Sequence, residues 1–175
     1  DGFARGAEAV RSLSQSGLFP SNCRLLDPTE ALTSGAGSGR EAVLVLGFES
    51  ADHPLDAWVA RAVECCLDAG GTVPEDAVRT RTTAESEGGD REGAAGAWRQ
   101  AFLQAPYLRD HLVSMSVLVE TFETAITWER FEAFHRGVMA AAGDAVKRIC
   151  GAGSVACRFT HVYPDGPAPY YTLLA

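Results

Sequence analysis

Two arginines and one tyrosine are the residues of this 175-residue chain whose types and settings best suit chemistry. Arg24 lies in the partly apolar stretch PSNCRLLD, and Arg109 follows Pro106 in APYLRDHL. Arginine presents a rigid fork of N–H donors that captures carboxylates and phosphates. Tyr170, in the closing stretch APYY, could donate or accept a proton if a positive charge lay nearby. The residue types alone therefore predict an α+β domain with an arginine-lined anion site.

Each of these residues also has a purely structural explanation. Arg24 could be a surface arginine that pairs with Asp27. Arg109 could be a solvated charge beside Asp110, and buried packing is the commoner fate of a tyrosine such as Tyr170. Composition and spacing leave these alternatives open.

Two further stretches place polar side chains on strands. Glu120 and Glu123 bracket Phe122 near a strand end, and alternation puts the two carboxylates on opposite faces, which favours a structural role. In CRFTHVY, the same alternation predicts one face with Arg158, Thr160 and Val162, and another with Cys157, Phe159, His161 and Tyr163. Past the turn, Tyr170 should share its face with Thr172.

The overall composition excludes several classes of partner. The net charge is -8 and the pI is near 4.9, which argues against nucleic acid and anionic membranes. No apolar run approaches the roughly 20 residues of a membrane helix. The five cysteines include no C-x-x-C pair, so we expect no metal site and mostly buried thiols in a reduced cytoplasm.

Hydrophobic spacing predicts the elements that position these residues. Apolar residues recur every three or four positions in three predicted helices, 2–17, 52–71 and 127–150, and Pro106 should kink or divide a fourth, 97–112. For the helix 127–150 the spacing predicts a buried stripe of Phe131, Phe134, Val138, Ala142, Ala145 and Ile149. Strands are expected at 23–27, 41–50 and 113–123 and in the hairpin 154–175, and a surface loop is expected at 79–96. The order favours an α+β fold of ferredoxin-like type, an antiparallel sheet with helices packed on one face.

The stretches PSNCRLLD, PYLRD, VETFETAITWERF and CRFTHVYPDGPAPYY together resemble the C-terminal substrate (cap) domain of FAD-linked oxidases of the vanillyl-alcohol oxidase type. Within that family the resemblance is strongest to the alkyldihydroxyacetonephosphate synthase branch, and it runs over nearly the whole chain in the same order. It implies FAD as cofactor and a small anionic substrate. The family activity would replace the acyl group of acyl-dihydroxyacetone phosphate by an alkyl group, a step of ether-lipid synthesis.

The resemblance also implies roles for single residues. Tyr170 matches the tyrosine that serves the family as acid and base, and Arg24 matches an arginine important for activity. Arg109 matches an arginine that contacts the substrate. The family's FAD-binding domain and a histidine-rich segment have no counterpart in residues 1–175. We therefore expect one cap domain that works with the FAD domain of the same polypeptide, and no turnover from this chain alone.

Two other functions remain open at this stage. The chain could be the cap domain of an FAD-dependent oxidase or dehydrogenase of 2-hydroxy acids, or a free-standing ferredoxin-like module that binds a small anion. An acidic domain whose flavin-facing surface is uncovered can also form a homodimer through that surface.

Overall fold

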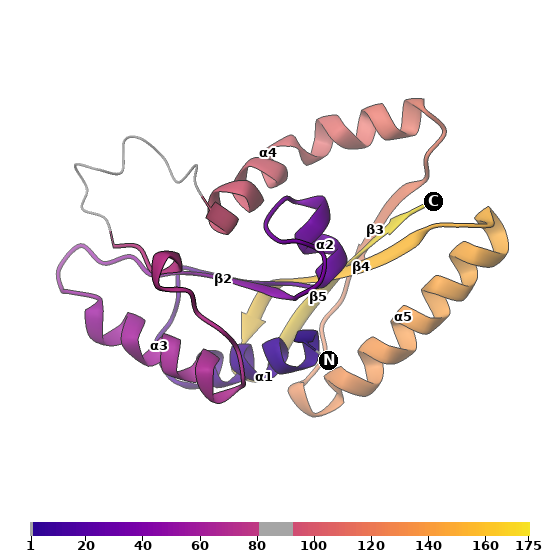
Figure 1. Ribbon diagram of the computed structural model, residues 1–175. Coiled ribbons are helices and arrows are strands. Elements are labelled where there is room, and N and C mark those ends of the chain that lie inside the picture. The colour runs from indigo at the N-terminus through magenta and orange to yellow at the C-terminus, as the bar shows by residue number, and fades with distance from the viewer. Residues whose placement is uncertain (1, 81–92) are drawn as a thin grey trace.

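A computed structural model describes residues 2–80 and 93–175 of the chain. Most of the surface loop predicted at 79–96 lies outside these residues, as does Asp1 before the first helix. The elements, shown in Figure 1, are α1 (Gly2–Gln15), β1 (Asn22–Leu26), α2 (Pro28–Thr33), β2 (Val43–Gly47), α3 (Asp56–Asp68), η1 (Glu75–Ala77), α4 (Gly93–Ser114), β3 (Val119–Glu123), α5 (Trp128–Cys150), β4 (Ser154–Tyr163) and β5 (Gly166–Leu174).

The strands form one antiparallel sheet in the order β2-β1-β4-β5-β3. Helices α1, α3 and α5 lie along one side of this sheet, and α2 and α4 lie on the other (Figure 1). We call these sides the core face and the polar face. The predicted α+β class with its antiparallel sheet is confirmed, and the short α2 and the long α4 add a partial cover over the polar face.

The core face is closed by aromatic rings from helices and strands. Phe131 of α5 meets Phe159 of β4 at 5.0 Å between ring centroids, nearly edge to face, and Phe3 of α1 lies 5.5 Å from Phe159. Such tilted arrangements are the favoured geometry of aromatic pairs. The buried cluster consists of Phe3, Ala7, Val10, Cys23, Leu25, Trp128, Phe131, Cys157, Phe159 and Tyr171.

The stripe predicted for α5 is right at its start and wrong at its end. Phe131 is buried and Phe134 and Val138 pack against the core, but Ile149 is 71% exposed. Val146 is the buried residue of the last turns instead. In α3, likewise, Cys65 is buried, while Leu67, two residues further on, is 51% exposed although it is apolar. The helical period predicted which face packs, but not how far along the helix the packing extends.

The hairpin β4–β5 departs from simple alternation at one residue. The register shifts between Phe159 and His161, so Thr160 is an extra residue in β4. Such a β-bulge reverses the faces beyond it. Val162 consequently packs against the core cluster, whereas His161 meets Glu123 on the polar face. The prediction that placed Val162 with Arg158, and His161 with Phe159, is therefore wrong.

The turn of this hairpin fits closely against the segment that precedes α5. Trp128 donates its backbone N–H to the carbonyl oxygen of Asp165, and its indole N–H to that of Tyr163. Glycine is needed at position 166, because a Cβ there would lie 1.9 Å from the carbonyl oxygen of Ile126. The contact fixes the end of the hairpin relative to α5.

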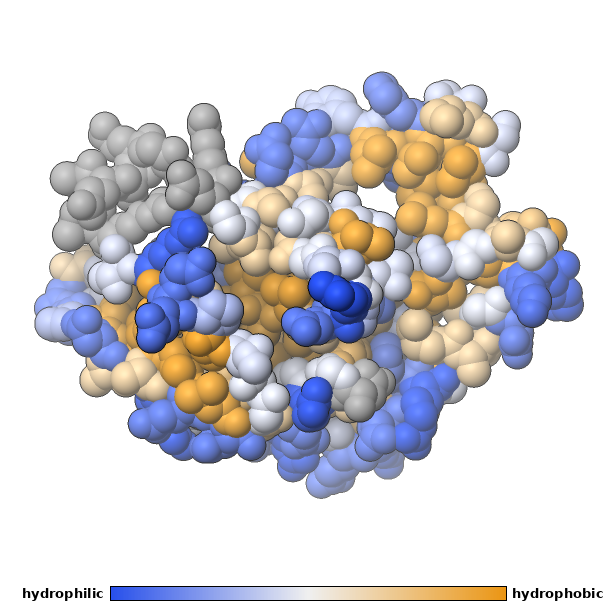
Figure 2. All heavy atoms as spheres, in the orientation of Figure 1, coloured by the Kyte–Doolittle hydropathy of each residue, from blue (hydrophilic) through white to orange (hydrophobic). Residues whose placement is uncertain are grey.

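Helix α4 is longer than predicted and less buried than the other long helices. It runs through Pro106 to Ser114, so the strand predicted at 113–123 begins only at Val119. Figure 2 shows hydrophobic side chains gathered along its C-terminal half and the segment that follows. The exposed apolar residues here are Phe102, Leu103, Tyr107, Leu108, Val113, Met115 and Leu118. No helix among the described residues is long and apolar enough to cross a membrane.

Candidate functional site

Tyr170 lies at the centre of the polar face because of the strand register. Its Cα partners are Arg158 on β4 and Glu123 on β3, so one row across the sheet reads arginine, tyrosine, glutamate. Paired residues of neighbouring antiparallel strands point to the same side of a sheet. The register therefore places a cation and an anion on either side of the phenol ring.

Arg158 is in direct contact with Tyr170. Its guanidinium carbon lies 4.1 Å from the centre of the tyrosine ring, which is a cation–π contact. The same guanidinium forms an ion pair with Glu30 of α2. The side chains of Arg158 and Glu30 are only 19% and 10% exposed. The pair is thus partly desolvated, and its geometry is tightly defined.

Asp27 joins α2 to the sheet directly beside this pair. One carboxylate oxygen accepts the backbone N–H of Glu30 at 2.7 Å and caps α2, and the other accepts the backbone N–H of Cys157 at 2.7 Å. Burial raises the pKa of the Asp27 carboxyl, although these two N–H donors favour the ionised form. Asp27 therefore has a structural role, and the ion pair with Arg24 considered from the sequence does not form.

Arg24 occupies the same face, one strand further from Tyr170. Its Nη1 donates to the carbonyl oxygen of Thr160, and its guanidinium lies 5.8 Å from the centre of the Trp98 ring. Burial is the main cause that lowers the pKa of Arg24, and Arg158 lowers it further, whereas Cys23 and Glu123 oppose the shift. Among residues 2–80 and 93–175, Nε and Nη2 of Arg24 have no hydrogen-bond partner. These donors are available to an anion.

The bulge residue Thr160 connects Arg24 with an acidic group. Its carbonyl oxygen accepts from Arg24, and its hydroxyl donates to the carboxylate of Glu123. The same carboxylate lies 3.5 Å from Nδ1 of His161. Within the described part of the chain, no cluster of three or more His, Cys, Asp or Glu side chains could hold a metal ion. The side chains gathered here can transfer protons and bind an anion.

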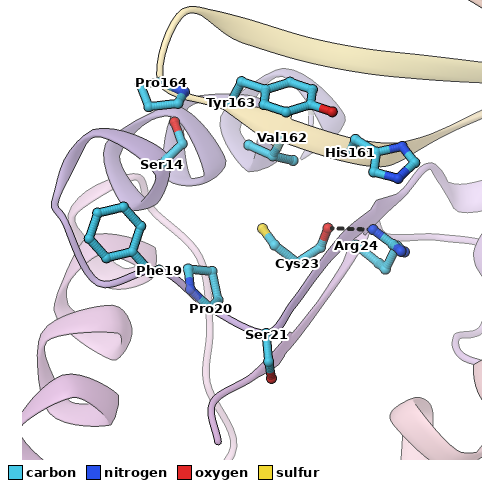
Figure 3. A pocket seen from close by; sticks show the side chains of 10 residues that line it. All are labelled: Ser14, Phe19, Pro20, Ser21, Cys23, Arg24, His161, Val162, Tyr163 and Pro164. Atoms are coloured by element: carbon cyan, nitrogen blue, oxygen red, sulfur yellow. Dashed lines mark hydrogen bonds between the residues drawn. The ribbon is translucent and has the colours of Figure 1, made fainter.

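A pocket of about 310 Å³ opens beside Arg24, between the ends of β1 and β4. In the described structure these strands pair at Leu26 and Arg158 alone, and the pocket lies beyond that point. Arg24 and His161 lie at one end of it, and Phe19 and Pro20 at the other (Figure 3). The combination of a guanidinium, an imidazole and apolar rings suits an anion that carries an apolar part.

Arg109 is placed elsewhere. It lies in the exposed half of α4, and no hydrogen bond or ion pair joins it to Arg24 or Tyr170 among the described residues. The structure thus places two of the three site residues that the sequence predicted, Arg24 and Tyr170, on the same face of the sheet, with strand β4 between them. Tyr170 is half-buried rather than enclosed, which differs from the buried packing considered as an alternative.

Sequence reasoning missed five members of this site, and it gave one of them, Glu123, a structural role. The residues Tyr170, Arg24, Arg158, Glu30, Glu123, Thr160 and His161 are referred to below as the polar-face cluster. The alternation of side chains in β4 had placed Arg158 and Thr160 together on one face, so the sequence did contain a signal that could have identified these two residues. Glu30 gave no signal, because its role depends on the way α2 folds back over β4. His161 was assigned to the wrong face because the bulge could not be seen.

Comparisons with known proteins agree with this fold. No curated protein matches the sequence. Two solved structures titled alkyldihydroxyacetonephosphate synthase, in crystal forms P1 and P212121, superpose with TM-scores of 0.72 and 0.73 at 15% and 16% identity. The matched regions include 99% and 98% of this chain, but only 34% and 33% of the two synthase chains. This chain therefore spans about a third of their length. Residues 1–174 match the model of the FAD linked oxidases, C-terminal domain. The chain therefore belongs to the family of FAD-linked oxidase C-terminal domains.

Proposed function

We propose that residues 1–175 form the substrate-binding (cap) domain of a flavin-dependent enzyme whose substrate is a small anion. The observation that carries this proposal is the polar-face cluster. In a chain of net charge -8, one face of the sheet gathers two arginines around a half-buried tyrosine. Family membership adds that such domains occur in FAD-linked oxidases.

Within this site the two functional residues have separate tasks. Arg24, whose Nε and Nη2 have no hydrogen-bond partner in the described parts of the chain, binds the phosphate or carboxylate of the substrate. Tyr170 moves a proton to or from the substrate, because it is a half-buried phenol on the same face of the sheet as Arg24. Arg109 on α4 is a further proposed contact of the substrate.

The residues present fit the reacting edge of a flavin better than its phosphates. The polar-face cluster holds acid–base groups and guanidinium groups, and it contains no glycine-rich loop of the kind that cradles a pyrophosphate. We propose that the FAD domain of the same polypeptide binds the cofactor and that the polar face is turned toward it. Bound FAD would supply the electron-accepting ring next to the substrate.

The reaction that we propose is the exchange of the acyl group of acyl-dihydroxyacetone phosphate for an alkyl group. An ester C–O bond breaks, an ether C–O bond forms, and a fatty acid leaves as a fatty alcohol enters, without net oxidation. The fold shared with alkyldihydroxyacetonephosphate synthase supports this choice. The second candidate is the oxidation of a 2-hydroxy acid, because the donors of Arg24 bind a carboxylate as well as a phosphate.

Tyr170→Phe in the full-length flavoprotein tests the proposal. Removal of the hydroxyl should lower kcat roughly 10²- to 10⁴-fold, the range typical of acid–base groups, while FAD content stays unchanged. Turnover is measured with acyl-dihydroxyacetone phosphate and a fatty alcohol, and separately with a series of 2-hydroxy acids.

Tyr171→Phe is the matched control, since it removes a hydroxyl from the neighbouring residue on the core face. Its kcat should stay within a few-fold of the parent. A Tyr170→Phe protein that turns over at the parental rate would rule out the proposed role of this tyrosine.

A further inference from the structure

Arg158 differs from Arg24 in having its guanidinium already occupied. Its guanidinium carbon lies over the ring of Tyr170, 4.1 Å from the ring centre, and one of its N–H groups donates to the carboxylate of Glu30. A planar guanidinium can make both contacts at once, because its N–H groups point outward in the plane that stacks. The two contacts hold Arg158 in one place and leave it a poor ligand for an incoming anion.

The acidic partner of Arg158 is itself held in place. Glu30 is 7% exposed and lies in the first turn of α2. Asp27 caps this turn by accepting the backbone N–H of Glu30, and its second carboxylate oxygen accepts the N–H of Cys157, the residue directly before Arg158. A chain of contacts therefore runs from the backbone of β4 through α2 and back to the side chain on β4.

We propose that Arg158 is a positioning residue for Tyr170 and that Glu30 is its tether. The stacked guanidinium fixes the plane of the ring, and thereby the direction in which the hydroxyl points. Because the protein holds Arg158 before any ligand arrives, this orientation is ready in the free enzyme. The inference rests on the proposed function, which gives Tyr170 its role in proton transfer.

A spectroscopic test needs neither substrate nor flavin. The protein is labelled with 3-fluorotyrosine, and the fluorine resonance that disappears in Tyr170→Phe is assigned to Tyr170. Arg158→Gln uncovers one side of the ring, so this resonance should shift and respond more strongly to exchange of H2O for D2O. Arg158→Lys should behave in the same way, since a lysine ammonium cannot lie flat on the ring and bind Glu30 together.

Two variants complete this test. Glu30→Gln keeps the size of the tether but removes its charge, and it should shift the Tyr170 resonance in the same direction by a smaller amount. Arg136→Gln is the control, because Arg136 forms an exposed pair with Glu132 on α5, on the other side of the sheet. It should leave the Tyr170 resonance unchanged.

Kinetics in the full-length flavoprotein separate positioning from anion binding. Arg158→Lys should lower kcat roughly 10- to 100-fold, the loss expected when a reacting group is misplaced, with KM within about twofold of the parent. A rise in KM at unchanged kcat would instead make Arg158 an anion ligand and overturn the proposal.

The outcomes also distinguish this proposal from the function on which it rests. A Tyr170 resonance unchanged in both Arg158→Gln and Arg158→Lys, each shown to be folded by circular dichroism, overturns the positioning role and leaves the proposed function standing. Should Arg158→Gln fail to fold, Arg158→Lys decides alone. Full activity of Tyr170→Phe would overturn the proposed function, whereas the contact detected by the fluorine resonance would persist.

Discussion

Tyr170 and Tyr171 are neighbours in β5, yet they lie in opposite environments. Tyr171 is fully buried on the core face, stacks on Phe122 at 4.9 Å, and has its hydroxyl 3.3 Å from Nδ1 of His135. Burial, together with Cys157, raises the pKa of Tyr171 far above the ordinary value of a phenol. Tyr170 is half-buried beneath a guanidinium on the polar face.

The difference between the two tyrosines shows that the two faces of one sheet have different tasks. Side chains on the core face stabilise the fold, and side chains on the polar face are available for chemistry. On the core face a phenol behaves as a large apolar ring whose hydroxyl needs one partner. On the polar face the same group lies next to charges and within reach of a ligand. Alternation along the strand places the two residues on opposite faces of the sheet.

The strongest expected effect on stability is at the junction that holds the polar face together. Asp27→Ala should lower the free energy of unfolding by about 2–4 kcal/mol, because it removes a helix cap and leaves the buried N–H of Cys157 without a partner. Urea unfolding measures the change. Asp144→Ala, at an exposed position of α5, is the control and should change the stability by less than about 0.5 kcal/mol.

A loss at Asp27 no larger than that at Asp144 would show that α2 is not anchored to β4 through this carboxylate. The polar face would then lack the rigid support that the comparison with the core face assumes. Asp27→Asn refines the measurement, since an amide keeps one acceptor oxygen and should cost less than the alanine.

The second expected effect concerns ligand binding on the polar face. Arg24→Gln in the full-length enzyme should raise the KM for the anionic substrate roughly 10- to 100-fold, the value of a lost charged hydrogen bond. Arg109→Gln should raise it by a smaller factor, because Arg109 is on the exposed half of α4. If Arg109→Gln has the larger effect, the anion is bound under α4 and the pocket beside Arg24 is not its site.

The smallest expected effect is a pH dependence on the core face. Burial lowers the pKa of His135, so the imidazole is neutral in the folded protein at pH values where it is protonated in the unfolded chain. Its contribution to stability is therefore complete above the unfolded pKa near 6.5 and is lost as the pH falls toward the lower folded value.

Unfolding free energies at pH 7.5 and pH 5.5 test this expectation. The loss of stability on acidification should be smaller in His135→Gln than in the parent. Exposed His111 supplies the control, and His111→Gln should keep the parental pH dependence. An unchanged pH dependence in His135→Gln would mean that the core face contains no titrating group of consequence in this range.

Much of the fold could be predicted from the sequence, because helical spacing and capping are local signals. Helices α1, α3 and α5 begin and end near the predicted residues, and Thr127, the first residue of the predicted range 127–150, is the N-cap residue of α5. Errors arose where packing is decided by distant parts of the chain. Ile149 continues the apolar period of α5 but is exposed, and α4 continues to Ser114 where a strand was expected from residue 113.

The site was only half predictable for the same reason. Arg24 and Tyr170 were selected by residue type and resemblance, and the sheet places both on the polar face. The row of Arg158, Tyr170 and Glu123 depends on strand register, which the sequence alone does not encode in an obvious form. The tether from Glu30 depends on a short helix that folds back over the sheet.

Thr160 interrupts the alternation of side chains in β4, because it is an extra residue without a Cα partner on β5. Because the extra residue bulges out of the register, His161 and Val162 lie on the faces that they would have in a strand without it. Deleting Thr160 would make Phe159 and His161 direct neighbours in a regular strand, so the histidine would stay on the polar face and Val162 would stay in the core. The deletion would instead remove the hydroxyl that donates to Glu123 and the carbonyl oxygen that accepts from Arg24, so the bulge serves the contacts of the polar face rather than the placement of His161.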